Sequence, residues 1–396
     1  MKSRFCLLLS LAVAALPVMV QAQPNAIATN PLLASQIVER YAEHIFYASG
    51  ATGMALVAID GNQKVFASHG ETRPGNDMQP RKDSLIRIAS LSKLMTSEVM
   101  VKLAEQGVLR LDDPLSKYAP PGHSVPSYGS QTIRLINLAT HTSGLPREQP
   151  GGHWPRPVFI WPTHDQRWNW LNNASLKTPP GARAEYSNLG FDLLADALTR
   201  AAGHPYPTLL KSMVTRPLGM KDTTFTPSPE QCARLMIPAK GASPCNNTLA
   251  AIGSGGVYST PDDMGRWMQQ FLSSDVHVRS PQVDRLQTLI YTRGQLTKVE
   301  GMDVPGKADA LGMAWVYMAP RDDRPGIIEK TGGGGGFITY IAMAPKYNIG
   351  VFVVVTRSDL TRFTAMSDGV NDLLTELVNN RGLTACTAES RCPAVL

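Results

Sequence analysis

The chain has 396 residues, a formal net charge of +6 and 18% charged residues, which is the composition of an ordinary globular protein. Its lysines and arginines form no block, so the sequence has no electrostatic footprint for nucleic-acid binding. No stretch after residue 22 approaches 18 unbroken apolar residues, and the sequence therefore predicts no membrane span there.

The first 22 residues predict a cleaved secretory signal. Lys2 and Arg4 precede an apolar stretch, and Val20-Gln21-Ala22 forms a small-residue cleavage site before Gln23. A membrane anchor is the alternative, but the shortness of the apolar stretch, the proline at position 17 and the cleavage pattern favour removal. We therefore expect an exported protein.

Four cysteines remain after cleavage: Cys232, Cys245, Cys386 and Cys392. Four cysteines in an oxidising compartment allow three pairings, of which the two local ones, 232 with 245 and 386 with 392, are the simplest. A metal site is the alternative, but neither pair has a histidine nearby and the chain contains no C-x-x-C. We expect structural disulfides, no metal and no cofactor.

The N-terminal region predicts a helix followed by a hairpin. Residues 32–48 have amphipathic helical spacing. Residues 53–59 and 64–67 are β-rich and flank a turn containing Asp-Gly, which is typical of an antiparallel hairpin. Residues 84–88 then alternate as an extended segment, and a helical pattern follows until Gly107.

The C-terminal region predicts strands again, after a segment rich in Pro, Gly and Trp with short helical patterns such as Phe191–Leu198. A helix begins with Ser259-Thr260-Pro261-Asp262-Asp263. Strands at 311–317, 326–330, 336–344 and 349–356 precede a helix at 360–379. We predict an α+β fold of the kind in which an antiparallel sheet is flanked by helices. The sheet domain is built from both chain ends, residues 30–110 and 250–380. A mainly helical domain is inserted at 111–249, and a C-terminal tail follows at 381–396.

Ser90 and Lys93 stand three residues apart where the extended segment turns into the helix. Residues i and i+3 share a helix face, so the hydroxyl and the amine can touch. A helix N-terminus also offers free backbone N–H groups and a positive dipole end, which suit a nucleophile whose attack creates an oxyanion. About one S-x-x-K is expected by chance in such a chain, so the motif is weak by itself.

Two further triplets strengthen the case that Ser90 and Lys93 belong to a functional site. Tyr186-Ser187-Asn188 is the only Y-x-N in the chain, and Lys330-Thr331-Gly332 is the only K-T-G. A loop tyrosine with a turn asparagine, or a strand lysine before a glycine turn, would also explain each one separately. A K-T-G by chance is rare, about 0.1 per chain of this size. All three motifs occurring once, in this order, predict a site.

The chemistry of these residues is coherent. Ser90 needs a proton acceptor, and Lys93 and Tyr186 can supply one as a coupled unit, because nearby ammonium groups favour a neutral lysine and a phenolate. Asn188 can bind a peptide bond of the substrate. Lys330 and Thr331 can hold a terminal carboxylate. The N–H groups of Ser90 and Gly333 can form an oxyanion hole.

With these motifs the chain resembles the serine β-lactamase and penicillin-binding protein family over nearly its whole length after the signal. Further family landmarks are Leu138–Pro146, Arg216–Asp222, Gly255–Pro261 and Leu311–Trp315. Tyr-x-Asn as the second motif is similar to class C β-lactamases and their carboxypeptidase relatives. The sequence departs from the family at Gly333, where a small polar residue is usual.

The resemblance implies a periplasmic serine DD-carboxypeptidase and endopeptidase in cell-wall remodelling or recycling. Its substrates would be the D-Ala peptides of peptidoglycan muropeptides, which acylate Ser90, and β-lactams would be covalent inhibitors. A class C-type β-lactamase and an esterase of the same fold are the enzymatic alternatives, and a sensor that only binds is the alternative from another class. Peripheral contact with the inner membrane and the oligomeric state stay open.

Overall fold

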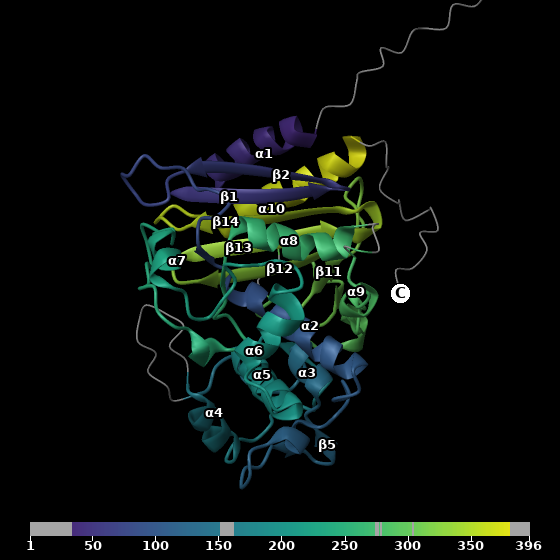
Figure 1. Ribbon diagram of the computed structural model, residues 1–396. Coiled ribbons are helices and arrows are strands. Elements are labelled where there is room, and N and C mark those ends of the chain that lie inside the picture. The colour runs from purple at the N-terminus through teal and green to yellow at the C-terminus, as the bar shows by residue number, and fades with distance from the viewer. Residues whose placement is uncertain (1–33, 151–161, 274–276, 278, 303–304, 381–396) are drawn as a thin grey trace, which may run out of the picture. The chain divides into compact units, whose positions relative to one another are not determined.

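A computed structural model describes residues 34–150, 162–273, 277, 279–302 and 305–380. The predicted signal, the C-terminal tail and the pair Cys386 and Cys392 lie outside these residues. Within them the centre of the fold is an antiparallel sheet (Figure 1). Its strands, in spatial order, are β2 (Gln63–Gly70), β1 (Gly53–Asp60), β14 (Ile349–Thr356), β13 (Phe337–Ala344), β12 (Ile327–Gly334), β11 (Val316–Met318), β10 (Ala310–Leu311) and β8 (Tyr291–Thr292).

Both faces of the sheet are buried, because alternate side chains of each strand pack on different layers. Met54, Leu56 and Ala58 of β1 belong to the cluster that includes α1 (Ala34–Ser49) and α10 (Phe363–Asn380). Their neighbours Ala55, Val57 and Ile59 belong to the cluster that includes α8 (Pro261–Leu272). The sheet therefore lies between two helical layers, and the α+β prediction is confirmed.

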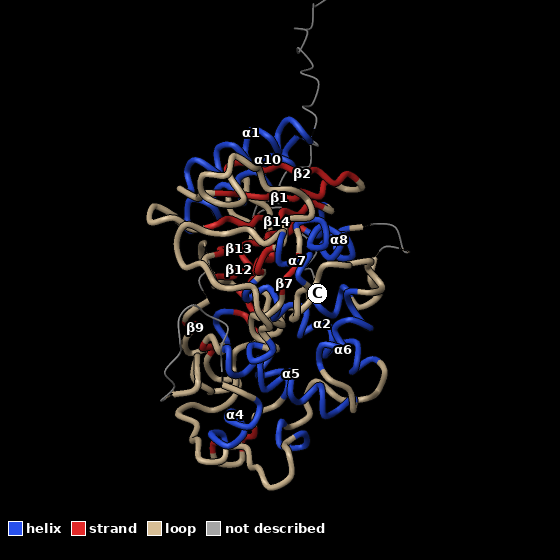
Figure 2. Tube along the Cα trace, turned by 60° about the vertical axis from the view of Figure 1, so that its left-hand side comes forward, coloured by secondary structure: helices blue, strands red, loops and turns tan. Residues whose placement is uncertain are grey.

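The chain between β2 and β8 forms, besides α8, the helices α2 (Ser92–Glu105), α3 (Leu135–Ala139), α4 (His164–Leu171), α5 (Asn188–Ala202), α6 (Tyr206–Leu210), α7 (Pro229–Ala233) and α9 (Val283–Leu286). Figures 1 and 2 both show α2, α4, α5 and α6 beyond β12, away from β2 and β1. Short strand pairs accompany them: β3 (Ile86–Arg87) with β7 (Tyr258–Ser259), β4 (Ser127–Tyr128) with β5 (Gln131–Thr132), and β6 (Ala184–Glu185) with β9 (Val299–Glu300). The exact domain boundaries stay a prediction.

Two strand predictions need correction. Residues 311–317 are not one strand but β10 and β11, joined by a tight turn in which Ala314 has φ 67°. The extended segment at 84–88 contributes only β3, which pairs with β7 outside the main sheet. Alternating apolar residues predict an extended backbone but do not specify its partner.

One predicted disulfide is present, since Cys232 and Cys245 are bonded with an S–S distance of 2.13 Å. It closes a loop that runs from α7 toward β7. The helix start at Thr260 is also confirmed, because the Thr260 side chain accepts a hydrogen bond from the Asp263 N–H. Among the described residues, none of the helices combines the length and apolar character needed to cross a membrane.

Candidate active site

Ser90 lies at the junction between β3 and α2. It occupies a 3₁₀ turn, Ala89–Leu91, and α2 begins at Ser92, so Ser90 precedes the helix instead of opening it as the sequence predicts. Ala89 is buried with φ 48°, a conformation that is uncommon for a residue with a side chain. Such backbone strain persists only where the surrounding structure stabilises it. Here the strained turn places the Ser90 side chain next to Lys93 and Tyr186.

Lys93 contacts Ser90 from the first turn of α2. Its Nζ donates to Ser90 Oγ at 3.2 Å, to Asn188 Oδ1 at 2.6 Å and to the Ser254 carbonyl at 2.6 Å. Lys93 is fully buried, and this burial, followed by the charge of Lys330, lowers its pKa well below the usual value. The neutral amine is therefore more favoured for Lys93 than for a lysine exposed to solvent.

Tyr186 reaches Ser90 from the other side, just before α5. Its hydroxyl donates to Ser90 Oγ at 2.5 Å. Three basic groups lie over its ring: Lys93 Nζ at 4.7 Å, Lys330 Nζ at 4.9 Å and the Arg147 guanidinium at 4.6 Å from the centroid. The predicted grouping of Ser90, Lys93, Tyr186 and Lys330 is therefore present in the structure.

Strand β12 brings Lys330 and Thr331 to the same place. A Cβ on Gly332 would lie 2.7 Å from the Ile88 carbonyl oxygen and 2.3 Å from Thr339 Oγ1, so only glycine lets β12 approach the Ser90 turn this closely. Thr331 is largely buried, while a Cβ on Gly333 would meet its first neighbour only at 4.0 Å. Strand β12 is thus closely packed at Gly332, beside the Ser90 turn, and has free space next to Gly333.

Asn188 connects the lysine to a carboxylate that the three motifs do not indicate. While its Oδ1 accepts from Lys93, its Nδ2 donates to Glu148 Oε1. Burial raises the pKa of Glu148. Arg147 and Glu148 directly follow the family landmark that ends at Pro146, which is the signal that could have identified them.

His141 braces the tyrosine motif, as its position in the landmark suggests. Its Nδ1 accepts the Ser187 N–H at 3.0 Å, and its ring stacks on Tyr186 with centroids 4.5 Å apart. Burial lowers the pKa of His141 well below the usual value. The imidazole is therefore neutral and acts as an acceptor. In the described part of the chain, no group of three or more His, Cys, Asp or Glu is placed to hold a metal ion.

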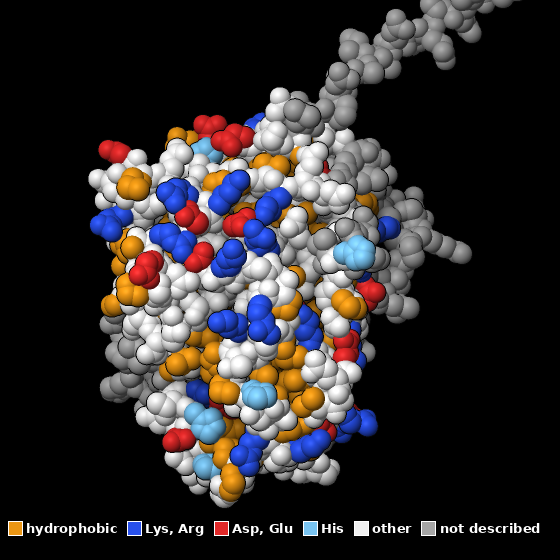
Figure 3. Space-filling view, viewed as in Figure 1, with side chains coloured by type: hydrophobic (Ala, Val, Ile, Leu, Met, Phe, Trp, Pro, Cys, Tyr) orange, Lys and Arg blue, Asp and Glu red, His pale blue; other side chains and the backbone are white. Residues whose placement is uncertain are grey.

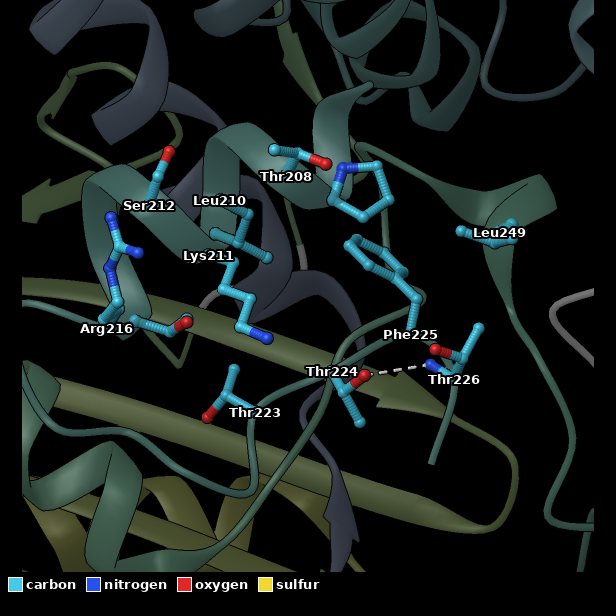
Figure 4. A pocket seen from close by; sticks show the side chains of 12 residues that line it. Thr208, Leu210, Lys211, Ser212, Arg216, Thr223, Thr224, Phe225, Thr226 and Leu249 are labelled. Carbon is cyan, nitrogen blue, oxygen red and sulfur yellow. Dashed lines mark hydrogen bonds between the residues drawn. The ribbon is translucent and has the colours of Figure 1, made fainter. Parts of the chain in front are cut away.

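A separate pocket of about 420 Å³ lies beside α6 and the π-helical turn Lys211–Thr215 (Figure 4). Threonines and Phe225 line it, and Ser90, Lys93, Tyr186 and Lys330 do not. On the face shown in Figure 3, basic side chains lie beside acidic ones. Asp262 forms ion pairs with Lys64 at 2.7 Å and with Arg266 at 3.1 Å. The candidate site is defined by the three motifs and not by these features.

A serine held between a lysine and a tyrosine, beside a K-T-G strand on this sheet, is the arrangement of a serine hydrolase of the β-lactamase type. Comparison with known families agrees, because the family model described as "Beta-lactamase" matches residues 34–374. The chain belongs to the β-lactamase family.

Within that family the chain is 70% identical over 355 residues to "D-alanyl-D-alanine-carboxypeptidase/endopeptidase AmpH" of Escherichia coli (strain K12), covering 90% of this chain and 92% of the relative. It is 65% identical to a crystal structure described as "Beta-lactamase/D-alanine Carboxypeptidase from Yersinia pestis complexed with citrate", with a TM-score of 0.86 over 88% of this chain and 100% of that one. A class C β-lactamase from Rhodobacter sphaeroides shares the fold at 21% identity, with a TM-score of 0.69 over 87% of this chain and 99% of the other.

Proposed function

We propose that this protein is a serine D-alanyl-D-alanine carboxypeptidase and endopeptidase that forms an acyl-enzyme on Ser90. The observation that carries the proposal is the placement of Ser90 Oγ between Tyr186 OH at 2.5 Å and Lys93 Nζ at 3.2 Å. The similarity to AmpH supports the choice of substrate, since the name of that relative states both activities.

The reaction proceeds in two steps. Ser90 Oγ attacks the carbonyl carbon of the penultimate D-Ala, and its proton passes to the Lys93–Tyr186 pair. The C–N bond breaks as the departing amine takes that proton. Water then hydrolyses the ester on Ser90, which releases the shortened peptide and restores the hydroxyl.

The remaining residues bind the substrate. Lys330 and Thr331 hold the terminal carboxylate of a carboxypeptidase substrate through a charge and a hydroxyl. Asn188 binds a peptide bond of the substrate. The N–H groups of Ser90 and Gly333 stabilise the oxyanion that develops on the carbonyl oxygen.

Peptidoglycan muropeptides are the substrates and β-lactams are covalent inhibitors, because a β-lactam presents the same carbonyl and carboxylate to Ser90. Such a function belongs in the periplasm, to which the predicted signal would deliver the protein, and it serves cell-wall remodelling or recycling.

The test is covalent labelling by a fluorescent penicillin. The wild-type protein should carry one label per chain, and Ser90→Ala should carry none, because the substitution removes the hydroxyl that Lys93 and Tyr186 contact. Ser116→Ala, which removes an exposed serine in another part of the helical region, is the matched control and should label as the wild type does. Undiminished labelling of Ser90→Ala would contradict the assignment.

A β-lactamase is the second candidate, favoured by the similar Yersinia pestis protein, whose description names both activities. The two enzymes share acylation and differ in how fast water reaches the ester. Release of D-alanine from a pentapeptide muropeptide, compared with turnover of a chromogenic cephalosporin, decides between them. We expect rapid release of D-alanine and slow cephalosporin turnover.

A further inference from the structure

A second buried carboxylate lies close to the candidate site but outside the three motifs. Asp192 stands one turn after Asn188 in α5 and is 1% exposed. Its Oδ1 accepts the backbone N–H groups of Gly253 at 2.9 Å and of Ser254 at 3.0 Å. The carboxylate thus binds two consecutive backbone groups of a segment far away in the sequence.

The same segment is fixed from α2 as well. Thr96 Oγ1 donates to the Gly253 carbonyl at 2.9 Å, and Lys93 Nζ donates to the Ser254 carbonyl at 2.6 Å. A Cβ on Gly253 would lie 2.0 Å from the Phe191 carbonyl oxygen, so the backbone rests directly on α5. Residues 253–254 are therefore clamped between α2 and α5, with each N–H bound by Asp192 and each carbonyl bound by α2.

We propose that Asp192 is a positioning residue for Lys93, acting through the backbone of Gly253 and Ser254. By holding both N–H groups, the carboxylate orients the Ser254 carbonyl that receives the Lys93 Nζ. Lys93 in turn is kept within 3.2 Å of Ser90 Oγ. This inference rests on the proposed acylation of Ser90 and adds a residue to it.

The charge of Asp192 acts on Lys93 too. Burial and Lys330 lower the pKa of Lys93, whereas Asp192 and Glu148 oppose that lowering. Asp192 itself has its pKa raised by burial, against the opposing charges of Arg167 and Lys93.

Other charged and titratable groups face this pair. Arg147 lowers the pKa of Lys93 from the loop after α3, and Tyr206 of α6 has its pKa raised partly by Asp192. Replacing Asp192 by a neutral residue leaves Lys330, Glu148 and Arg147 in place around Lys93. Removing the negative charge must therefore favour the neutral amine of Lys93 at a lower pH.

The experiment is the pH dependence of the acylation rate constant of the full-length protein with a fluorescent penicillin. Asp192→Asn keeps an oxygen acceptor for both N–H groups and removes the charge. We expect its acid limb to move to lower pH by about half a unit or more. Asp192→Ala removes the acceptor as well, and its rate at the optimum should fall by about 100-fold because Lys93 loses its alignment.

Asp263→Asn is the matched control. Asp263 is also a buried carboxylate with a pKa raised by burial, and it accepts the Asp222 N–H at 2.8 Å, but it does not act on Lys93. Its acid limb should coincide with that of the wild type.

The outcomes separate the two proposals. Absence of labelling in the wild type would overturn the proposed function. With wild-type labelling intact, a wild-type rate at the optimum in folded Asp192→Ala would overturn the positioning role of Asp192. A wild-type acid limb in folded Asp192→Asn would overturn the action of its charge on Lys93. If Asp192→Asn does not fold, Asp192→Ser, which keeps a small uncharged acceptor, takes its place with the same expected shift.

Discussion

At the scale of single residues, the site depends on Lys93 and Tyr186 together. Lys93 Nζ has three hydrogen-bond partners: Ser90 Oγ, Asn188 Oδ1 and the Ser254 carbonyl. Lys93 is therefore held in one orientation. The Tyr186 hydroxyl makes the shorter contact with Ser90, at 2.5 Å, and three basic side chains lie over its ring. We infer that Tyr186 and Lys93 share the Ser90 proton as a coupled pair, in which the neutral amine of Lys93 is required for the transfer.

This coupling predicts the effect of Tyr186→Phe. The substitution keeps the ring among its basic neighbours and removes only the hydroxyl, so general-base assistance is lost while packing is retained. Acylation by a fluorescent penicillin should slow by about 10²- to 10⁴-fold, with an unchanged melting temperature. Tyr340→Phe, which removes a buried hydroxyl bound to Asn371 at 3.0 Å on another layer of the sheet, should leave the acylation rate unchanged. A Tyr186→Phe rate within a few-fold of the wild type would show that Lys93 alone serves as the base.

At the scale of elements, α2 is tied to the layer that covers the sheet. Glu98 is fully buried in the middle of α2 and accepts the indole N–H of Trp267 at 2.8 Å and the amide of Gln270 at 3.2 Å, both from α8. Lys102 of the next turn pairs with it at 2.7 Å. Because Lys93 is on the same helix, this polar cluster helps to fix the site relative to β1 and β14.

Glu98→Ala should therefore destabilise the fold. The substitution leaves the Trp267 and Gln270 donors buried without an acceptor and Lys102 without its pair, which together cost about 2–4 kcal/mol of unfolding free energy. Denaturant unfolding with a constant slope measures the loss. Glu105→Ala, at the exposed end of the same helix, should change the unfolding free energy by no more than about 0.5 kcal/mol. Equal values for the two variants would show that the buried cluster contributes nothing.

The elements also show what the sequence could predict. The helix α2 and the strands β12–β14 have local patterns, and these predictions agree with the structure. The structure also brings the side chains of the three motifs together around Ser90. The contact of Lys93 with Ser254 spans 161 positions and uses a backbone carbonyl, which no residue type signals. Similarly, Ala314 adopts a left-handed backbone conformation, which is uncommon for alanine and is not indicated by its residue type. The sequence pattern therefore predicts a strand through the turn between β10 and β11.

At the scale of the whole described fold, the first and last long strands of the sheet pair with each other, next to the edge strand β2. Strands β1 and β14 pair over eight residues, from Gly53 with Thr356 to Asp60 with Ile349. Helices α1 and α10 pack on each other and on the same layer of apolar side chains. Such long-range pairing is slow to form, because the entropy of loop closure is lost before the contacts between the strands stabilise the pair. The sheet that carries Lys330 therefore depends on contacts between the first and last elements.

One close contact between these elements lies between Gly369 of α10 and Ile45 of α1. A Cβ on Gly369 would lie 2.6 Å from Ile45 Cγ1, a distance that real side chains do not tolerate. Alanine gains about 1 kcal/mol over glycine in a helix. Overpacking of a core costs about 1–3 kcal/mol. The clash should win, and Gly369→Ala should lower the unfolding free energy by about 1–2 kcal/mol.

A double-mutant cycle checks that prediction. In an Ile45→Ala background Cγ1 is absent, so Gly369→Ala should there be neutral or stabilising by up to about 1 kcal/mol. The coupling between the two positions should therefore be about 1–3 kcal/mol, measured by denaturant unfolding of the four proteins. Additive effects would mean that α1 and α10 can separate slightly at no cost. Strong coupling would mean that the crossing of the terminal helices is rigid and holds β1 against β14.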